Sequence, residues 1–349
     1  MSSPHRNTDD SPAEAARALL SVVGESGGFG LERLTGGRNN RVFRLDTAER
    51  SFLLKIYFRD DNDTRDRLGS EFGFISYAWE RGIRSIPQPF AEDRQRSSAL
   101  YGFIEGRKLT PGSVDAGHIR QAMGFYTALN GDTASDNARR LPDGSESCFS
   151  IREHLSCVDR RISRLKILSV HDDVSLEARR FVERELKPSW ERLRSGVLAD
   201  ARDLDPGREL TPGERCISPS DFGFHNAVLD KRGSLYFIDF EYAGWDDPAK
   251  TVCDFFCQPE VPVPMVFFPA VFEGVAAVSG GDALQRRVRV LLPVYRLKWS
   301  CIALNDFLAG GSSRRRFSDE PGGGDARIEQ LATARAFLTE ALIEHPLGI

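Results

Sequence analysis

The chain has 349 residues, of which 40% are hydrophobic and 28% are charged. This composition excludes wholesale disorder, and the length favours two lobes or domains over one. The formal net charge is −4, which excludes a strongly basic nucleic-acid-binding coat. We therefore expect no nucleic-acid partner.

The cysteines and the apolar segments indicate a reduced, soluble protein. The six cysteines form no Cys-X-X-Cys pair, and no histidine near Cys253 and Cys257 completes a zinc site. The first ten residues are polar, and prolines and a glutamate interrupt the most apolar stretch, 261–278. We therefore predict a cytoplasmic protein with reduced thiols and no membrane partner.

The first hundred residues alternate between helical and strand patterns. Ser11, Pro12 and Glu14 predict a capping box that starts a short helix, which ends at Gly24. The pattern then predicts, in chain order, three antiparallel strands, a helix and two further strands over 29–35, 41–46, 51–58, 62–81, 87–93 and 98–105.

The third strand carries one lysine opposite an apolar row. Phe52, Leu54, Ile56 and Phe58 share one parity and therefore one face, so Lys55 points to the other face. A solvated strand lysine is the alternative interpretation.

The following helix carries a carboxylate beside its apolar stripe. Leu68, Phe72, Ile75 and Trp79 form the predicted buried stripe, and Glu71 lies next to it. An exposed helical charge is the alternative.

Beyond a glycine- and proline-containing linker at 106–112, the pattern becomes mostly helical. We place the lobe boundary there, with one lobe over 1–106 and a second over 107–349. Helices are predicted over 113–130, 149–168, 174–200 with an interruption at Pro188, 283–308 and 326–344, and a glycine-rich loop over 309–325.

One β-hairpin in the second half carries the strongest chemical signal. Its strands, 227–229 and 235–238, flank a four-residue turn. Asn226 and Asp239 lie symmetrically about that turn, so antiparallel pairing is expected to place them side by side at the open end of the hairpin. Asp221 lies in the loop that leads into this end. Asp221 could alternatively be only a turn former. Two carboxylates and one carboxamide are the oxygen ligands that Mg²⁺ prefers.

These parts resemble, in the same order over nearly the whole chain, the aminoglycoside phosphotransferase and choline-kinase-like family, small-molecule relatives of the protein kinases. The resemblance implies an α+β, two-lobed protein-kinase-like fold with a small antiparallel-sheet lobe and a larger helical lobe. The residues that it assigns to the nucleotide are Gly36, Gly37, Arg38, Asn39 and Asn40 over the ATP phosphates, Lys55 with its partner Glu71, and Gly102, Phe103 and Ile104 at the adenine hinge. A plain hairpin turn is the alternative for residues 36–40.

The resemblance also implies the chemistry. It identifies Asp221 as the catalytic residue, and Asn226 and Asp239 as the metal-holding pair. ATP and Mg²⁺ are the expected cofactors, with GTP left open, and the phosphate acceptor is a hydroxyl of a small molecule. The family usually carries His-Gly-Asp at its catalytic loop, whereas this chain has Pro219 two residues before Asp221. Ser218 or Ser220 is a candidate substitute brace for that loop.

Acceptor recognition is expected in the helical lobe. The candidates are acidic, aromatic or amide side chains: Glu241, Tyr242, Trp245, Asp254, Trp299 and Asn305. Such groups suit a sugar, polyol or amino alcohol, and an aminoglycoside is also possible. Core packing is the alternative for Trp299, because it shares a helical spacing with Tyr295 and Ile302. A nucleotide-binding pseudokinase is the alternative function, and the chain is expected to be a monomer or homodimer.

Overall fold

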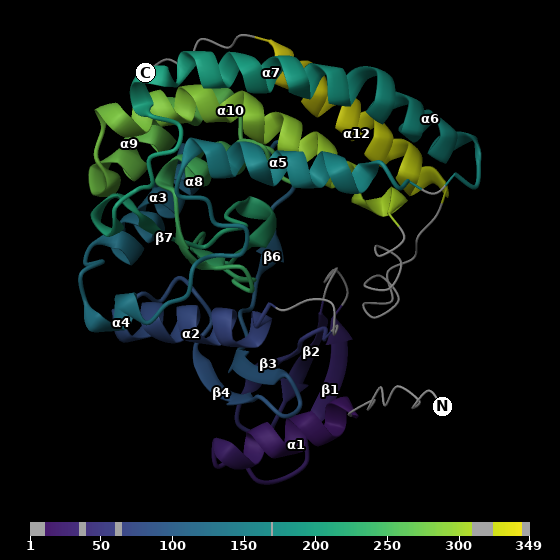
Figure 1. Ribbon diagram of the computed structural model, residues 1–349. Coiled ribbons are helices and arrows are strands. Elements are labelled where there is room, and N and C mark those ends of the chain that lie inside the picture. The colour runs from purple at the N-terminus through teal and green to yellow at the C-terminus, as the bar shows by residue number, and fades with distance from the viewer. Residues whose placement is uncertain (1–10, 35–39, 60–64, 169, 309–323, 344–349) are drawn as a thin grey trace, which may run out of the picture.

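A computed structural model describes residues 11–34, 40–59, 65–168, 170–308 and 324–343. Figure 1 shows a small sheet lobe at one end and a larger helical lobe at the other. Residues 36–39 of the predicted loop 36–40, and residues 309–323 of the predicted loop 309–325, lie outside the described residues.

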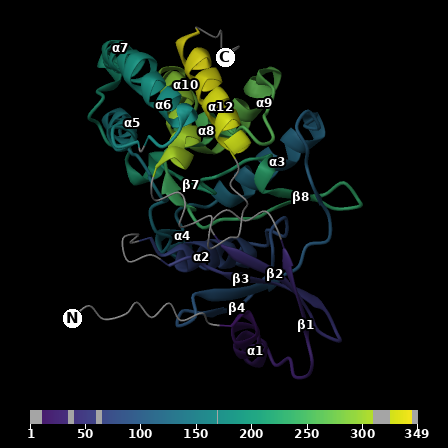
Figure 2. The same ribbon diagram turned by 90° about the vertical axis from the view of Figure 1, so that its right-hand side faces the viewer.

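The sheet lobe is built on a five-stranded antiparallel sheet with the order β1-β2-β3-β5-β4. Its strands are β1 (Gly30–Leu34), β2 (Arg41–Asp46), β3 (Ser51–Ile56), β4 (Pro89–Asp93) and β5 (Ser98–Gly102). Helix α1 (Pro12–Val22) covers the face that points away from the helical lobe (Figure 2). All five strands fall within the predicted ranges.

The start of α1 differs from the prediction in one respect. Ser11 is the N-cap residue, but its side chain makes no capping hydrogen bond, and only its carbonyl oxygen accepts, from the N–H of Glu14 at 2.8 Å. The predicted capping box is therefore wrong. Pro12, whose missing N–H needs no partner at a helix start, occupies the first position as expected.

The two faces of β3 divide as the alternation predicted. Phe52, Leu54 and Ile56 are buried against α1, while Lys55 and Tyr57 are buried on the opposite face. Apolar burial thus fixes the register of β3 and, with it, the direction of Lys55.

Helix α2 (Arg67–Glu80) covers that opposite face and also contacts the helical lobe. Its most buried apolar residues include Phe74 and Tyr77, whereas Phe72 and Trp79 are only half-buried. The predicted four-residue stripe was therefore too narrow, because a helix packed on two sides buries more than one row of side chains.

The helical lobe contains the remaining elements. Its strands are β6 (Arg107–Lys108), β7 (Cys216–Ser218), β8 (Ala227–Leu229), β9 (Leu235–Phe237) and β10 (Gly244–Asp246). Its helices are α3 (Ala116–Asn130), α4 (Asp136–Arg139), α5 (Ile151–Leu165), α6 (Asp173–Phe181), α7 (Lys187–Asp200), α8 (Pro248–Phe255), α9 (Phe268–Ser279), α10 (Asp282–Ala303) and α12 (Gly324–Leu342). Single 3₁₀ turns span Arg202–Leu204, Pro212–Glu214, Phe224–Asn226, Met265–Phe267 and Leu304–Phe307. Helix α10 packs against α12, α8 and α5.

Two helical segments refine the predictions. A π-helical turn, Val182–Leu186, joins α6 to α7 where an interruption at Pro188 was expected, and the proline sits in the first turn of α7. Most of α9 lies within the apolar stretch 261–278, for which no helix was predicted.

The hairpin of β8 and β9 forms with a register one residue away from the predicted one. Ala227 pairs with Phe237, so the residue opposite Asn226 is Ile238, whose N–H donates to the Asn226 carbonyl at 2.9 Å. Asp239 follows in a left-handed conformation, with φ of 66°. The chain therefore bends at Asp239, whose carboxylate contacts Lys55 of the sheet lobe, and the strand pairing that was expected between Asn226 and Asp239 does not form.

All six cysteines are buried free thiols, as predicted. Among the described helices, none combines the length and the apolar character that a bilayer crossing requires.

Candidate active site

Lys55 connects the two lobes through two short ion pairs. Its Nζ lies 2.6 Å from Oε2 of Glu71 on α2 and 2.6 Å from Oδ1 of Asp239 after β9. Burial would lower the pKa of the lysine, but the charges of Asp239 and Glu71 raise that pKa well above its ordinary value. Lys55 is therefore a fixed cation where the lobes meet.

The two carboxylates of this cluster differ. Burial raises the pKa of Glu71 above its usual range. For Asp239 burial acts in the same direction, but the adjacent Lys55 charge outweighs it and lowers the pKa. The Glu71 side chain is only 4% exposed, whereas that of Asp239 is 41% exposed, so only Asp239 remains open to a ligand.

Glu71 is held in place by neutral donors as well. The hydroxyl of Tyr57 donates to Oε2 at 2.8 Å, and the Tyr57 and Tyr101 hydroxyls lie 2.8 Å apart. The N–H of Phe240 donates to Oε1 at 3.2 Å. Because both carboxylate oxygens are engaged, Glu71 presents one fixed orientation to Lys55.

The residue after Phe240 makes a third link to the sheet lobe. Glu241 is 3% exposed and accepts a hydrogen bond from Nδ2 of Asn40 at 2.8 Å. Nε of Arg67 lies 3.5 Å from the same Glu241 oxygen. Asn40 also accepts from the N–H of Phe58 at 3.2 Å. Three consecutive residues, 239–241, are thus tied to the sheet lobe.

Asp221 lies in the loop between β7 and β8. Nδ2 of Asn226 lies 3.1 Å from its carbonyl oxygen and 3.3 Å from Oδ2, and Nε2 of His225 lies 3.3 Å from Oδ1. Its side chain is 41% exposed. The loop is braced from behind, since Oγ of Ser218 accepts from the N–H of Ser220 at 3.0 Å.

The donor set suits a magnesium–nucleotide complex better than a metal held by protein alone. Among the described residues, no group of three or more histidine, cysteine or acidic side chains is placed to hold a metal ion. Asp239 offers a partly exposed carboxylate. The amide nitrogen of Asn226 donates to Asp221, so the amide oxygen of Asn226 is the atom that can bind a cation. Mg²⁺ is commonly held by few protein oxygens plus substrate phosphates, so these residues fit the ion.

The segment predicted as an adenine hinge follows β5. Gly102 donates its N–H to the carbonyl of Gln88, and Phe103 donates to that of Ser51. Neither backbone polar group of Ile104 makes a hydrogen bond within the described part of the chain. Of the three predicted hinge residues, Ile104 is therefore the one whose backbone N–H and carbonyl are both without a hydrogen-bond partner among the described residues.

The predicted acceptor residues do not gather in one place. Asp254 and Trp299 meet, with the indole N–H donating to Oδ1 at 2.8 Å, and Lys298 lies 3.3 Å from the other carboxylate oxygen. Trp245 instead donates its indole N–H to the Ala138 carbonyl. Asn305 is exposed in a 3₁₀ turn.

The remaining two acceptor candidates lie near the lobe interface. Glu241 is engaged as described above, and the ring of Tyr242 lies 5.5 Å from the guanidinium of Arg65. Of the residues predicted to lie over the ATP phosphates, Asn40 contacts Glu241, and Gly36, Gly37, Arg38 and Asn39 lie outside the described residues.

Sequence reasoning missed the contacts of His225 and Arg67. His225 was noted only as displaced from the usual catalytic-loop position, yet it lies only four residues after Asp221, close enough in sequence for one loop to bring the two side chains together. Arg67 carried no signal, because its partner Glu241 is distant in sequence.

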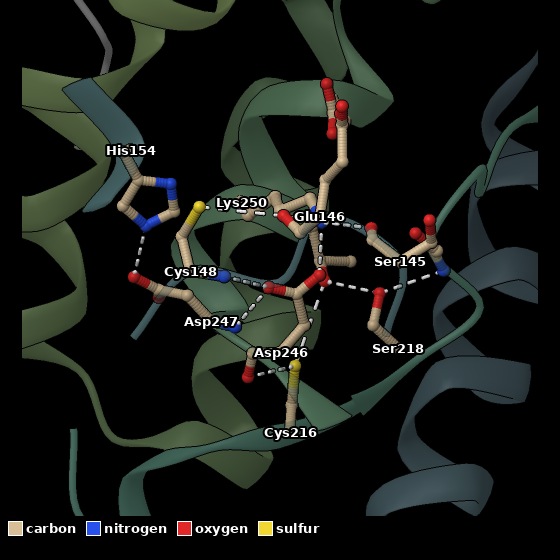
Figure 3. Close-up of polar contacts among 12 residues, drawn as sticks. Ser145, Glu146, Cys148, His154, Cys216, Ser218, Asp246, Asp247 and Lys250 are labelled. Atoms are coloured by element: carbon tan, nitrogen blue, oxygen red, sulfur yellow. Dashed lines mark hydrogen bonds and ion pairs between the residues drawn. The ribbon is translucent and has the colours of Figure 1, made fainter. Parts of the chain in front are cut away.

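A second cluster of buried charges lies deeper in the helical lobe (Figure 3). Asp247 accepts from Nε2 of His154 at 3.0 Å and from Nε of Arg287 at 3.1 Å, and Asp246 pairs with Lys250. Asp247 also caps α8 by accepting from the N–H of Ala249. A separate cavity of about 390 Å³ between the π-helical turn, α7 and α12 shares no residue with Asp221, Asp239 or their partners.

Comparisons with known proteins agree with this geometry. The model of the phosphotransferase enzyme family matches residues 30–282. The AMP-bound spectinomycin phosphotransferase aligns with a TM-score of 0.62 and 11% identity, covering 95% of this chain and 98% of that one. A choline/ethanolamine kinase family protein from Mesorhizobium loti aligns with a TM-score of 0.57 and 18% identity, covering 95% and 98%.

The gentamicin complex of APH(2")-IIa aligns with a TM-score of 0.55 and 15% identity, covering 96% of this chain and 97% of that one. The comparison with curated proteins gave no match. The match of the family model over most of the chain, together with a sheet lobe joined to a helical lobe by Lys55, shows that the chain belongs to the phosphotransferase enzyme family and has its protein-kinase-like fold.

Proposed function

We propose that this chain is an ATP- and Mg²⁺-dependent phosphotransferase that transfers the γ-phosphoryl group to a hydroxyl of a small molecule. The observation that carries the proposal is the position of Lys55, 2.6 Å from both Glu71 and Asp239, with Asp221 and Asn226 at the open end of the same hairpin. Solved structures of the same fold with bound ADP or AMP support the use of a nucleotide.

Each residue has a defined task in this mechanism. When bound, Mg-ATP supplies the phosphoryl group, and its metal offsets the triphosphate charge. Lys55 contributes a fixed positive charge beside the phosphates, while Asn226 and Asp239 supply oxygen ligands for the ion. Asp221 orients the acceptor hydroxyl and takes its proton as the new O–P bond forms, and the bond between the γ-phosphorus and the bridging oxygen breaks to release ADP.

The acceptor is proposed to be a sugar, polyol or amino alcohol, with an aminoglycoside as a further possibility. The residue types of the candidates support this class, because carboxylates accept from hydroxyl and ammonium groups, and aromatic faces attract cations. Asp254 and Trp299, which lie together, are the pair proposed to meet the acceptor. Solved structures of the same fold include choline kinases and spectinomycin phosphotransferase.

The test is ADP release from Mg-ATP across a panel of sugars, polyols, amino alcohols and aminoglycosides, with Asp221→Asn as the blank. We expect one class to stimulate ADP release and the variant to lose that stimulation. Mg-ATP should also raise the melting temperature of the wild type and have much less effect on Asp239→Ala. Binding of Mg-ATP without stimulation by any class would favour the alternative pseudokinase.

A further inference from the structure

Both carboxylate oxygens of Asp221 are held by the 3₁₀ turn that follows it. Oδ2 lies 3.3 Å from the Asn226 amide, and Oδ1 lies 3.3 Å from Nε2 of His225. The His225 side chain is only 9% exposed, whereas that of Asp221 is 41% exposed. A rigid, nearly buried imidazole therefore contacts a carboxylate that faces the solvent.

Gly223 leaves the space that the imidazole needs. A Cβ atom at residue 223 would lie 2.8 Å from Nδ1 of His225 and 3.0 Å from its Cε1. The φ of Gly223 is 179°, an extended conformation that any residue adopts. The contact with the His225 ring, and not the backbone conformation, therefore favours glycine at this position.

The backbone of His225 is also anchored. Nζ of Lys108 on β6 donates to the His225 carbonyl oxygen at 2.8 Å, which ties the turn to the strand paired with β8. The ring therefore sits on a turn that is fixed at its backbone as well as packed against Gly223.

The contact also defines which ring nitrogen faces the carboxylate. Nε2 of His225 lies 3.3 Å from Oδ1 of Asp221, and a carboxylate can only accept a hydrogen bond or pair with a cation. The other ring nitrogen, Nδ1, is buried, lies against Gly223 and has no hydrogen-bond partner in the described part of the chain.

We propose that His225 is a positioning residue that fixes the orientation of the Asp221 carboxylate, in place of a histidine at position 219. Pro219 has no side-chain donor, and Ser218 braces the backbone of the loop but not the carboxylate. The inference rests on the proposed function, since it concerns how Asp221 meets the acceptor hydroxyl.

The first test is a pair of substitutions analysed as a double-mutant cycle. His225→Ala is expected to lower kcat by roughly 10²-fold, the scale of a misplaced reacting group, with an unchanged KM for Mg-ATP. Gly223→Ala displaces the ring and should act in the same direction, but it should add nothing in the His225→Ala background. Additive effects of the two substitutions would overturn the proposal.

Recovery of kcat by other substitutions separates a positioning role of His225 from a role in folding. His225→Gln keeps a donor at the location of Nε2 and should recover most of kcat, whereas His225→Ala combined with Pro219→His should recover part of it from the other side of Asp221. His171→Ala, at an exposed histidine, is the matched control. A His225→Ala enzyme with wild-type kcat, or a His225→Gln enzyme as slow as His225→Ala, contradicts the proposal.

A readout without turnover keeps this inference distinct from the proposed function. In the nucleotide-free protein, the ¹⁵N signal of His225 Nε2 should shift in Asp221→Ala, because that substitution removes the carboxylate that lies 3.3 Å away. If no acceptor stimulates the wild type, the proposed function fails, and this spectrum alone decides whether the contact exists. A Nε2 signal that is unchanged in Asp221→Ala overturns the inference.

Discussion

Two buried charge clusters in this protein differ in whether they are closed. In the helical lobe, Asp247 and His154 are 0% exposed, and Asp247 already accepts from His154 and Arg287. Between the lobes, Lys55 and Glu71 are equally buried, but Asp239 is 41% exposed. The first cluster is complete without a ligand, whereas the second has one member open to the solvent.

The difference shows that a buried charge does not by itself indicate chemistry. A closed cluster fixes the positions of the elements around it, as Asp247 does for α5, α8 and α10. An open cluster leaves an ionised group that can exchange its partner for a ligand. Substitutions in the two clusters should therefore separate stability from turnover.

Asp239→Ala should have the largest effect. Turnover is expected to fall by about 10³-fold or more, because a charge that stabilises the transferred phosphoryl group is lost. Stability should change little, since Asp239 is partly exposed and Lys55 keeps Glu71 as a partner. Steady-state ADP release and urea unfolding measure the two quantities, and a folded variant with wild-type kcat would remove Asp239 from the mechanism.

Asp247→Ala should have the opposite profile. Arg287 and His154 would be left buried without their shared acceptor, which costs about 3–5 kcal/mol of unfolding free energy. Activity per folded molecule should be retained. Asp136→Ala, at a side chain that is 86% exposed, is the control in urea unfolding. A stability loss no larger than that of the control would show that the cluster is dispensable.

Acid should weaken the closed cluster within a defined pH range. Although burial acts in the opposite direction, Arg287 and His154 lower the pKa of Asp247 from 3.8 to about 2. Because the folded-state pKa is depressed, the stabilisation is complete above the unfolded pKa and disappears as pH falls through the folded pKa. The loss is about 2 kcal/mol between roughly pH 4 and pH 2. The urea midpoints of the wild type and of Asp247→Asn should converge as the pH falls through this range. Midpoints that keep a constant difference would contradict the assignment of this pH dependence to Asp247.

The smallest effect is expected at the proposed acceptor site. Trp299→Phe keeps an aromatic face but removes the indole N–H that donates to Asp254. Because that hydrogen bond orients the Asp254 carboxylate proposed to meet the acceptor, the KM for the acceptor should rise about fivefold, equivalent to about 1 kcal/mol, with the KM for Mg-ATP unchanged. An unchanged acceptor KM would place the acceptor elsewhere.

Local patterns predicted the strands of the sheet lobe, and the family resemblance predicted the protein-kinase-like fold and the pairing of Lys55 with Glu71. The parity of β3 fixed the face of Lys55, because burial of alternate residues leaves one register. The hairpin was found from its turn, but its register was one residue off. The Asp230 N–H donates to the Ser234 carbonyl and Gly233 has a φ of 83°, so the loop is one residue longer than the predicted turn. The longer loop shifts the pairing of the two strands by one residue.

Contacts between segments distant in sequence could not be predicted from the sequence. Glu241 was interpreted as an acceptor residue, yet its contacts with Asn40 and Arg67 form only when the two lobes meet. The closed cluster was missed for the same reason, because His154, Asp247 and Arg287 lie on three different elements. Periodicity reports which face is buried, but not which buried polar groups meet.

The six buried thiols give the protein an internal reporter of opening. All six lie between Cys148 and Cys301, so every one belongs to the helical lobe and none to the sheet lobe. A thiol reagent applied to the native protein can therefore modify a cysteine only after that lobe opens locally or unfolds. A single cysteine introduced at a buried position of the sheet lobe would add a second signal, on a different peptide. Mass spectrometry of the labelled peptides would then measure the opening rate of each lobe separately.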